Sequence, residues 1–373
     1  MEQISQIKTL SPEDSVHSKA IHGGTNIAES RVLNYQKVND FSASISPINI
    51  SKEILQLANN LDLSQYPDPD CLLLKERIST SLSTFSLNKE NISIGNGSTE
   101  IIYAIASAFL QSSRLPSSKS LIFHPTYGEY FTVSTLFKSQ ISLLTPTYLN
   151  PGWDWDWNLA ADFIQEMKPN LIFLCNPNNP TGTYFEKSKI TNLLKSMANQ
   201  SSILVIDEAY IDFVTDHNEL YDLVNEHNVI LLRSLTKSYG VTGLRLGYCL
   251  ANPKIISVID KYLPPWSVNS LAQIAGLNLF SDNDHIARGK AIVDESKVYL
   301  MNELGKLGYT VEPSETNFIL IKVSDATEMR IKLLEKNIMV RDCSSFDLPQ
   351  HIRIAIKTVK DSETFIHAIH GLA

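Results

Sequence analysis

The chain has 373 residues, of which 43% are hydrophobic and 19% charged, the composition of an ordinary globular protein rather than a disordered or fibrous one. Its 32 Lys and Arg residues against 40 Asp and Glu residues give a net charge of −8, and no basic run is present. This charge balance disfavours nucleic acid and anionic membranes as partners.

Neither targeting nor metal-binding signals are apparent. Residues Met1–Leu10 alternate polar and apolar side chains and lack the apolar core of a signal peptide. The longest apolar-rich stretch, Ile101–Leu110, is about half of the roughly 20 residues that cross a bilayer. The four cysteines are far apart, and no Cys or His spacing indicates a metal site or a disulfide framework. We therefore expect a soluble, cytoplasmic protein without a metal.

In chain order, the first 50 residues are rich in loop-forming residues and are expected to form an N-terminal arm that joins a smaller domain. From 51 to 273, short β-rich runs alternate with helical patterns such as Thr99–Leu110 and Glu186–Ala198. The expected strands are Asn91–Ile94, Ser120–Phe123, Asn170–Cys175, Ser202–Ile206, Asn228–Leu232 and Arg245–Leu250. This alternation predicts a large α/β domain with a doubly wound, mostly parallel sheet.

The pattern changes near residue 274. The expected elements are a long helix over Ile286–Leu307, a strand over Asn317–Val323, a helix over Glu328–Glu335, and strands over Met339–Arg341 and His351–Ile356. These elements predict a smaller α+β domain over residues 274–373.

A lysine lies between a predicted strand and a glycine-rich stretch. The segment SLTKSYGVTGLRLG follows the strand Asn228–Leu232 and contains Lys237. A solvated loop lysine is the ordinary interpretation. The functional interpretation makes Lys237 a Schiff-base nucleophile, with Ser234, Thr236 and Arg245 gathered around a phosphate.

Two upstream strands also end in polar side chains. The run Ser202–Ile206 is followed by Asp207, which could simply cap a helix, but ligands bind at the carboxyl ends of strands in doubly wound sheets. A carboxylate there could keep a pyridine nitrogen protonated, which makes pyridoxal phosphate an electron sink. Tyr210 and Asn179, the latter in a Pro-Asn-Asn-Pro turn after Asn170–Cys175, could donate to the phenolic oxygen of that cofactor.

A fourth strand end carries the sequence GNGSTE, which begins at Gly95 and opens a predicted helix. Capping of that helix by Ser98 is the ordinary interpretation. A phosphate held by the exposed amides and the helix dipole is the functional one. Four strand ends thus present an anion-binding turn, an amide, a carboxylate and a lysine, in that order.

Together these segments resemble the fold type I pyridoxal-phosphate enzymes of aminotransferase class I and II, and the similarity covers nearly the whole chain. The motifs NPNNPTG, DEAY and SLTKSYGVTGLRLG carry it, with 28 residues from Asn179 to Asp207 and 30 from Asp207 to Lys237. The resemblance implies pyridoxal 5'-phosphate as the cofactor. It also implies Lys237 as the lysine that binds the cofactor, Asp207 as the partner of the pyridinium nitrogen, and Tyr127 as the aromatic ring stacked on the pyridine.

Further positions carry over from the same resemblance. Asn179 and Tyr210 resemble the donors to the phenolic oxygen of the cofactor. The implied phosphate-binding positions are Ser98, Thr99, Ser234 and Arg245, and Thr236 is counted with them as cofactor-binding. Tyr66 resembles the tyrosine that reaches the cofactor phosphate of a neighbouring subunit, which implies a homodimer with shared active sites.

The substrate side points to one branch of the family. Arg353 resembles the arginine that binds the substrate α-carboxylate in a bidentate manner, and Asn179 is also counted as substrate-binding. The chain is similar to histidinol-phosphate aminotransferases and more closely to threonine-phosphate decarboxylases. The segments that carry this closer likeness are IHGG from Ile21, DFS from Asp40, PWSVN from Pro265 and VRDCSSF from Val340. It implies that His22, Gly23 and Arg341 help to hold a substrate phosphate.

Three positions depart from that branch. Ser44 and Ser46 stand where the related loop carries asparagines, and Thr25 follows His-Gly-Gly where Asn or Asp is common. Serine is shorter than asparagine and offers fewer donors, so the substrate pocket is expected to differ from that of the phosphate-binding relatives.

Several functions remain open at this stage. The leading hypothesis is a lyase that acts on an amino acid through an external aldimine and a quinonoid, with L-threonine-O-3-phosphate as the model substrate. A second is a dehydratase–cyclase of specialised metabolism acting on a hydroxy amino acid such as 4-hydroxyarginine, with Thr25, Ser44 and Ser46 facing its side chain. A third is an aminotransferase of the histidinol-phosphate type. A non-enzymatic, cofactor-binding regulator is disfavoured because the sequence contains no basic DNA-binding module.

Overall fold

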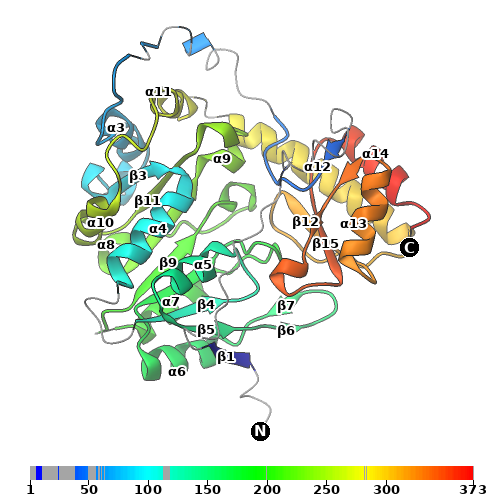
Figure 1. Ribbon diagram of the computed structural model, residues 1–373, viewed down its shortest axis with the longest axis horizontal. Helices are drawn as coiled ribbons and strands as arrows, with labels where there is room; N and C mark the ends of the chain where they lie inside the picture. The colour runs from blue at the N-terminus through cyan, green and yellow to red at the C-terminus, as the bar shows by residue number, and fades with distance from the viewer. Residues whose placement is uncertain are drawn as a thin grey trace.

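The computed structural model describes most of the chain, namely residues 6–10, 24, 38–48, 56–57, 59, 61–62, 64–111, 118–198, 200–280, 282 and 284–372. These residues form a large α/β unit and a smaller unit beside it. The long helix α12 (His285–Lys306) extends from the first unit along the second (Figure 1). Among the described helices, none is long and apolar enough to span a lipid bilayer.

The large unit is built on an eight-stranded sheet. In spatial order its strands are β1 (Ile7–Leu10), β5 (Gln140–Leu144), β4 (Lys119–Phe123), β8 (Leu171–Cys175), β9 (Ile203–Asp207), β10 (Val229–Ser234), β11 (Leu246–Leu250) and β3 (Ile92–Asn96). The five strands from β5 to β10 run parallel, whereas β1 and β11 are antiparallel to their neighbours. The mostly parallel sheet expected from the sequence is confirmed.

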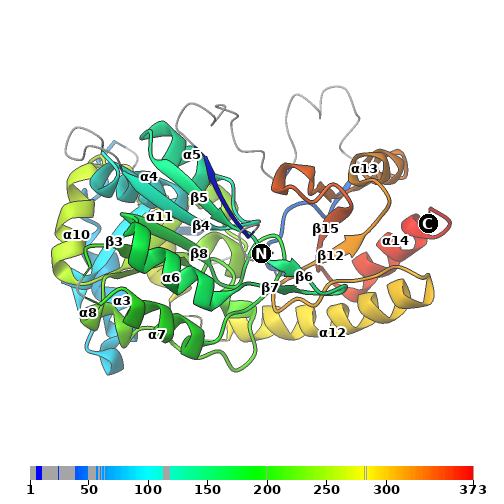
Figure 2. The same cartoon turned by 90° about the horizontal axis from the view of Figure 1, so that it is seen from below.

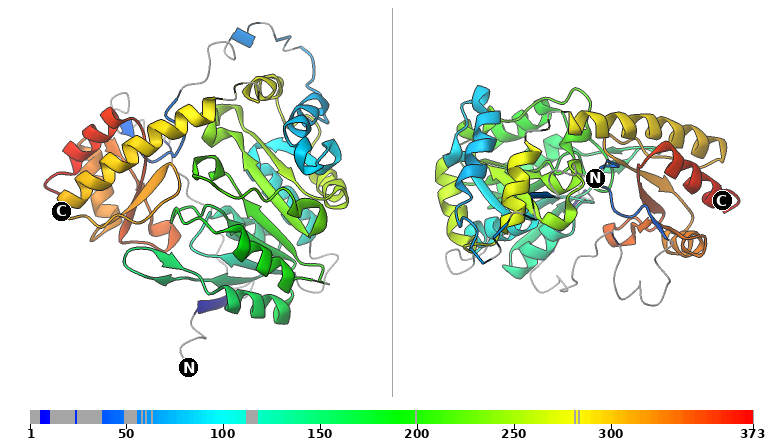
Figure 3. Two further views of the ribbon diagram at one scale, coloured as in Figure 1. Left: turned by 180° about the vertical axis from the view of Figure 1, so that it is seen from behind. Right: turned by 90° about the horizontal axis from the view of Figure 1, so that it is seen from above.

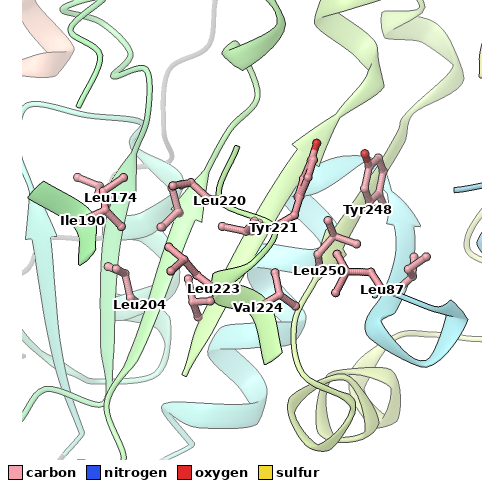
Figure 4. Close-up of a cluster of buried hydrophobic side chains, with 14 of the residues drawn as sticks. Leu87, Leu174, Ile190, Leu204, Leu220, Tyr221, Leu223, Val224, Tyr248 and Leu250 are labelled. Carbon is pink, nitrogen blue, oxygen red and sulfur yellow. The ribbon is translucent and has the colours of Figure 1, made fainter. Parts of the chain in front are cut away.

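Helices cover both faces of this sheet. One face packs against α3 (Leu72–Ser81), α6 (Trp157–Met167), α7 (Lys187–Ser196), α8 (Leu223–Glu226) and α11 (Ser270–Leu279). The other packs against α4 (Gly97–Phe109), α5 (Glu129–Leu136) and α10 (Pro253–Ile259). Along β9, Leu204 and Ile206 join the first apolar cluster, part of which Figure 4 shows, while Ile203 and Val205 join the second. Burial on both faces is why these strands read as continuous apolar runs.

Some strands end further along the chain than the sequence pattern predicts. β9 extends through Asp207 and β10 through Ser234. Both additions continue the backbone ladder, because Asp207 pairs with Leu232 and Ser234 pairs with Gly247. These polar residues are therefore held by rigid strands rather than by loops.

The smaller unit contains a three-stranded sheet of β12 (Phe318–Lys322), β15 (His351–Ala355) and β14 (Arg341–Asp342). Its helices are α12, α13 (Ala326–Glu335) and α14 (Val359–Ile369), and Figure 2 and Figure 3 show α12 and α14 side by side. Val293 of α12, Ile319 of β12 and Phe365 of α14 share a separate apolar core. The unit therefore has its own core, as an α+β domain requires.

The N-terminal residues divide between the two units. β1 lies at the edge of the large sheet, whereas β2 (Asn39–Asp40) pairs with β13 (Ile338–Met339) of the smaller unit. Phe41, next in the chain, is buried in the smaller unit's core. The described part of the expected arm over residues 1–50 thus does not join the smaller unit as a whole.

Two expected boundaries also differ. The prediction of one strand over Met339–Arg341 is wrong, because Met339 pairs with β2 and Arg341 pairs with β15, on either side of the buried Val340. The expected domain boundary at residue 273 falls inside α11, whose Ala275 and Leu279 pack in the core of the large unit. The domain limits themselves stay a prediction.

A hairpin of the large unit is hydrogen-bonded to the smaller unit. It consists of β6 (Thr147–Tyr148) and β7 (Trp153–Asp154), and it reaches toward β12 and β15 (Figure 2). The fully buried Glu312 accepts hydrogen bonds from the Tyr148 hydroxyl and the Gly152 N–H, both at 2.7 Å, and its Oε1 lies 3.3 Å from His351 Nε2. Burial alone would raise the pKa of Glu312, but these hydrogen bonds outweigh it and lower the pKa. The contact helps to set where the smaller unit sits.

We expect Glu312→Ala to lower the free energy of unfolding by about 2–4 kcal/mol, because the partly buried Tyr148 hydroxyl and Gly152 N–H would lose the carboxylate that accepts their hydrogen bonds. The difference from the native protein should shrink in acid. A carboxyl group whose pKa is lowered by folding stabilises the fold above its unfolded pKa, and that stabilisation disappears as the pH falls through the folded value.

Urea denaturation at neutral and at acid pH measures both effects. Glu328→Ala is the matched control, because it removes an exposed ion pair with Lys332 and should change the free energy by less than about 1 kcal/mol. Equal changes in the free energy of unfolding for the two substitutions would contradict the stabilising role of the Glu312 hydrogen bonds.

Candidate active site

A cavity of about 490 Å³ lies where the carboxyl ends of β8, β9 and β10 face the smaller unit. It is lined by most of the residues that the sequence singled out: Ser44, Ser98, Thr99, Tyr127, Asn179, Asp207, Tyr210, Ser234, Thr236, Lys237, Arg245, Arg341 and Arg353. Four of these carry a positive charge, whereas Asp207 and Glu100 are the lining carboxylates. The cavity therefore suits an anionic ligand.

The remaining sequence candidates lie elsewhere. His22, Gly23 and Thr25 lie outside the described residues. Tyr66 does not line the cavity; its side chain is 80% exposed and its ring lies 5.0 Å from that of Trp266. Ser46 also lies outside the lining, and its Oγ packs against Gly289 of α12.

Some lining residues had no role in the sequence interpretation: Ser42, Ala43, Asn96, Glu100, Gly128, Cys175, Ala209 and Phe346. Most of them are direct neighbours of candidates in the chain, so proximity to a motif was the signal that could have found them. Phe346 comes from the VRDCSSF segment and reaches the cavity only because the smaller unit docks there. A contact of that kind has no local signal in a sequence.

One end of the cavity is a small anion-binding site next to two glycines, here called the cradle. Gly97 begins α4 with a positive φ of 80°, and a Cβ there would lie 2.6 Å from Arg245 Nη2. A Cβ on Gly247 would lie 2.5 Å from the backbone nitrogen of Ser98. The two glycines thus let Arg245 and the first turn of α4 approach each other closely. A helix N-terminus with a nearby guanidinium is well suited to a phosphate.

Lys237 lies on the short helix α9 (Leu235–Ser238), which directly continues β10. Shortly before it in the chain, the hydroxyls of Ser234, at the end of β10, and Thr236, on α9, lie 2.7 Å apart. Burial lowers the pKa of Lys237 to about 8, and the positive charges of Arg353 and Arg245 lower it in the same direction. A larger share of this amine is therefore neutral, and the neutral amine is the nucleophile.

A largely buried cluster of charged side chains lies next to the carboxyl ends of β9 and β10, outside the cavity lining. Arg233 Nη2 lies 2.6 Å from Asp212 Oδ1, and Arg233 Nη1 lies 3.4 Å from Glu208 Oε2. Asp212 also accepts a hydrogen bond from the hydroxyl of Ser238, the residue after Lys237. The cluster thus ties the turn after β9 to the helix that carries the lysine.

Asp207 lies at the floor of the cavity and is 4% exposed. Burial raises its pKa, while hydrogen bonds from Tyr130 and from the N–H of Ala209, together with the charge of Lys237, act against that rise. Above the floor, the Tyr127 hydroxyl lies 3.2 Å from Thr99 Oγ1. A carboxylate and an aromatic ring thus line the same cavity.

The smaller unit contributes two arginines to the wall of the cavity that faces the large sheet. Arg353 of β15 donates to the Asn179 side chain and, at 3.2 Å, to the carbonyl of Ser42, while its Nε has no partner among the described residues. Arg341 of β14 donates to Ser345 Oγ at 2.7 Å. Burial and the neighbouring Arg353 lower the pKa of Arg341 to about 10. Both guanidinium groups therefore favour an anion in the cavity.

The loop after β2 closes the same wall. Ser44 is 1% exposed, and its Oγ has no hydrogen-bond partner among the described residues. Ser42 Oγ donates to Asp40 at 2.7 Å and accepts from the N–H of Gly24 at 2.9 Å. This contact holds Gly24, the last residue of the His-Gly-Gly segment, beside Ser42 of the cavity lining.

The comparisons with known proteins agree with this geometry. The family model of aminotransferase class I and II matches residues 34–369. The chain belongs to this family. A histidinol-phosphate aminotransferase from Thermoanaerobacter sp. is 34% identical over 329 residues, which cover 87% of this aminotransferase-family chain and 89% of the relative.

Solved structures extend the family likeness. The L-threonine-O-3-phosphate decarboxylase from Porphyromonas gingivalis is 25% identical with a TM-score of 0.77, and the match covers 89% of this chain and 98% of that one. The histidinol-phosphate aminotransferase from Sinorhizobium meliloti, solved with pyridoxal 5'-phosphate, shares the fold with a TM-score of 0.81 at 18% identity, over 95% and 96% of the two chains. This member of the aminotransferase family is a pyridoxal 5'-phosphate-dependent enzyme, a lyase or an aminotransferase.

The residues of the cavity fit this cofactor. The cradle beside Gly97 and Gly247 suits the phosphate, and Asp207 suits a protonated ring nitrogen because both would be buried together. Lys237 has the lowered pKa that a covalent attachment needs. We expect the remaining contacts to come from Ser98, Thr99, Tyr127, Asn179, Tyr210, Ser234, Thr236 and Arg245.

We expect Gly247→Ala to weaken binding of pyridoxal 5'-phosphate by at least about tenfold. The three atoms nearest to the new Cβ are all backbone atoms, namely the nitrogen of Ser98, the carbonyl carbon of Gly97 and the carbonyl oxygen of Arg233, so the first turn of α4 would have to shift. Such overpacking costs about 1–3 kcal/mol, which also predicts a lower free energy of unfolding.

Gly243→Ala is the matched control, because a Cβ at Gly243 meets nothing within 4 Å. Fluorescence titration with pyridoxal 5'-phosphate and urea denaturation measure the two effects. If Gly247→Ala and Gly243→Ala bind the cofactor equally well, the cradle is not the phosphate site.

Proposed function

We propose that this enzyme acts on a small amino acid whose side chain carries a second anionic group, with a phosphate ester as the leading substrate, and releases its carboxyl group as CO2. The observation that carries the substrate proposal is the arginine pair. Arg341 and Arg353 lie directly opposite each other on β14 and β15. Like charges at such a position destabilise a sheet, so a ligand with two negative groups explains why both are present.

Stacking holds each guanidinium in place. Arg353 lies over the ring of Phe318 with 5.0 Å between the guanidinium carbon and the ring centre, and Arg341 lies over Phe346 at 5.1 Å. A preorganised guanidinium binds carboxylates and phosphates in a bidentate manner with little further ordering. In the proposed complex, Arg353 binds the α-carboxylate and Arg341 binds the anion of the side chain.

The same pair disfavours one alternative from the sequence. A substrate such as 4-hydroxyarginine would bring a fourth guanidinium into a cavity whose lining already contains Arg245, Arg341 and Arg353. Like charges repel strongly where water is excluded. Of the serines proposed to face such a side chain, Ser44 lines the cavity but Ser46 does not.

The described side chains support the chemistry in distinct ways. When bound, pyridoxal 5'-phosphate supplies an electron sink for the bond that breaks at the substrate α-carbon. Asp207 pairs with the charged ring nitrogen, and Lys237, with its pKa near 8, is the group that gives a proton to the α-carbon or takes one from it. The apolar clusters that contain Tyr210 and the partly buried Tyr127 keep part of the cavity lining out of water, which strengthens nearby charge interactions.

Transamination of the histidinol-phosphate type is the second candidate. The 34% identity to a histidinol-phosphate aminotransferase favours it. A histidinol ester carries a phosphate but no carboxylate, so it would use only one of the two arginines. The decarboxylase named above, at 25% identity, favours the first candidate.

One experiment separates these reactions. We expect threonine phosphate, among a set that includes serine phosphate, histidinol phosphate and 4-hydroxyarginine, to lose CO2 when incubated with the cofactor-loaded enzyme. A 2-oxo acid is included so that an amino group can be transferred if the reaction is a transamination. Mass spectrometry distinguishes loss of CO2 from loss of water and from conversion of an amine to a ketone. Arg341→Ala should raise KM for the phosphate ester at least about tenfold, because a charged hydrogen bond pair is lost.

Arg330→Ala is a suitable control, since it removes an arginine of α13 that does not line the cavity. An amine-to-ketone change with histidinol phosphate would replace the lyase proposal with the aminotransferase. Turnover of 4-hydroxyarginine alone would contradict the role of the arginine pair.

We also propose that the enzyme is a homodimer in which Tyr66 of one copy completes the cofactor site of the other. The rings of Tyr66 and Trp266 contact each other at the surface with their planes tilted by 34°, and the two residues are 80% and 48% exposed. Leu72 and Leu73 of α3, soon after Tyr66 in the chain, are exposed as well. Exposed apolar side chains of this size are typical of a surface that binds another protein.

Mixing two inactive variants tests the shared site. Lys237→Ala and Tyr66→Ala should each be inactive alone, but random subunit exchange should restore about a quarter of the native activity, since half of the dimers would carry one complete site of two. Activity is followed with the substrate identified above, and exchange is checked by native mass spectrometry. No recovery despite verified exchange would mean that each site is built from one chain.

A further inference from the structure

Behind the floor of the cavity, the side chain of Tyr130 contacts Asp207. The hydroxyl of Tyr130 donates a hydrogen bond of 2.7 Å to Asp207 Oδ2, and the N–H of Ala209 donates one of 3.0 Å to Oδ1. Tyr130 is 0% exposed and does not line the cavity. Each carboxylate oxygen therefore has one fixed donor from the protein side.

The ring of Tyr130 has little freedom to move. It stacks on Phe173 of β8 with ring centres 5.0 Å apart and an angle of 6° between the planes. Tyr127 meets it edge-on at 5.6 Å. Because α5 holds its backbone and these rings hold its side chain, the hydroxyl stays directed at Asp207.

The surroundings of Asp207 make this donor important. The ionisable groups that face the carboxylate are Tyr130 of α5, Lys237 of α9, Cys175 of β8, Tyr127 and Tyr210. Lys237 is the cation among them, and it is also the residue proposed to bind the cofactor. Burial raises the pKa of Asp207, and the hydrogen bond from Tyr130 is the leading influence against that rise. Burial also raises the pKa of Tyr130 far above its usual range, so its hydroxyl keeps its proton and remains a donor.

We propose that Tyr130 is a positioning residue, which holds the Asp207 carboxylate in its charged form and in the orientation that pairs with the ring nitrogen of pyridoxal 5'-phosphate. This inference rests on the proposed role of Asp207. It goes beyond that role because Tyr130 does not line the cavity and would act only through the carboxylate.

If Tyr130 had only a structural role, a different result would be expected. A buried tyrosine needs a partner for its hydroxyl whatever its function, so loss of the hydroxyl would then lower stability alone. A positioning role also changes the pH at which the carboxylate is charged. The pH dependence of cofactor binding separates the two.

The test compares Tyr130→Phe with the native protein, using pyridoxal 5'-phosphate itself as the probe and fluorescence titration across a range of acid to neutral pH. Phenylalanine keeps the stacking on Phe173 and removes only the hydroxyl. We expect binding to be weaker by about tenfold, as for loss of a hydrogen bond to a charged acceptor. Without the donor the pKa of Asp207 rises, so the loss of affinity in acid should begin at a higher pH than in the native protein.

Tyr103→Phe is the matched control. The Tyr103 hydroxyl donates to Glu129 Oε2 at 3.0 Å, so this change removes a similar bond to a carboxylate of the same helix, α5. We expect its cofactor affinity and pH dependence to stay within about twofold of native, since neither group lines the cavity. An unchanged pH dependence in Tyr130→Phe would overturn the inference.

Two further variants keep the outcomes distinct. If Tyr130→Phe does not fold, Phe173→Leu is the substitute, because it loosens the stacking that directs the Tyr130 hydroxyl. The pH at which cofactor affinity falls in acid should then also move upward. If that pH does not change, the inference is again overturned. Asp207→Asn tests the site itself. Native affinity in Asp207→Asn would reject the proposed role of Asp207, whereas weak binding there with native behaviour in Tyr130→Phe would reject only the role of Tyr130.

Discussion

The parallel pairing of β8, β9 and β10 is the constraint on which the cavity depends. Cys175 lies opposite Asp207, and Asp207 lies opposite Leu232, so the carboxyl ends of all three strands reach one edge of the sheet. The antiparallel pair that follows brings Gly247 opposite both Ser234 and Gly95. A slip of one residue would turn each side chain of a strand to the other face, so the cavity requires this register to keep Asp207 and Ser234 in its lining.

Burial gives the charges of the cavity their properties. Removal from water lowers the pKa of Lys237 and raises that of Asp207, so both groups move toward neutral pH. Hydrogen bonds and neighbouring charges then decide how far each one moves. Behind them, Arg233 is paired with Asp212, and breaking such a buried pair is far more destabilising than its net contribution indicates. Reactive groups and supporting groups are thus parts of one desolvated region.

The substrate side depends on how the smaller unit docks. Arg341 and Arg353 reach the cavity because β14 and β15 approach the large sheet, where the Asn179 side chain and the Ser42 carbonyl accept hydrogen bonds from Arg353. The contacts of Glu312 with the β6–β7 hairpin hold the units together on another side. Specificity is therefore governed by contacts between units, whereas the cofactor side belongs mainly to the large one.

Sequence alone determined the local elements and the strand ends that carry Asn179, Asp207 and Lys237, because continuous apolar runs and the turns after them are encoded by neighbouring residues. It did not determine that Met339 and Arg341 pair with different strands or that Ser46 faces Gly289, since both depend on residues far away in the chain. The contact of Tyr130 with Asp207 joins positions 77 residues apart. Only the tertiary structure decided such contacts, because a side chain finds its partner through packing in space and not through spacing along the chain.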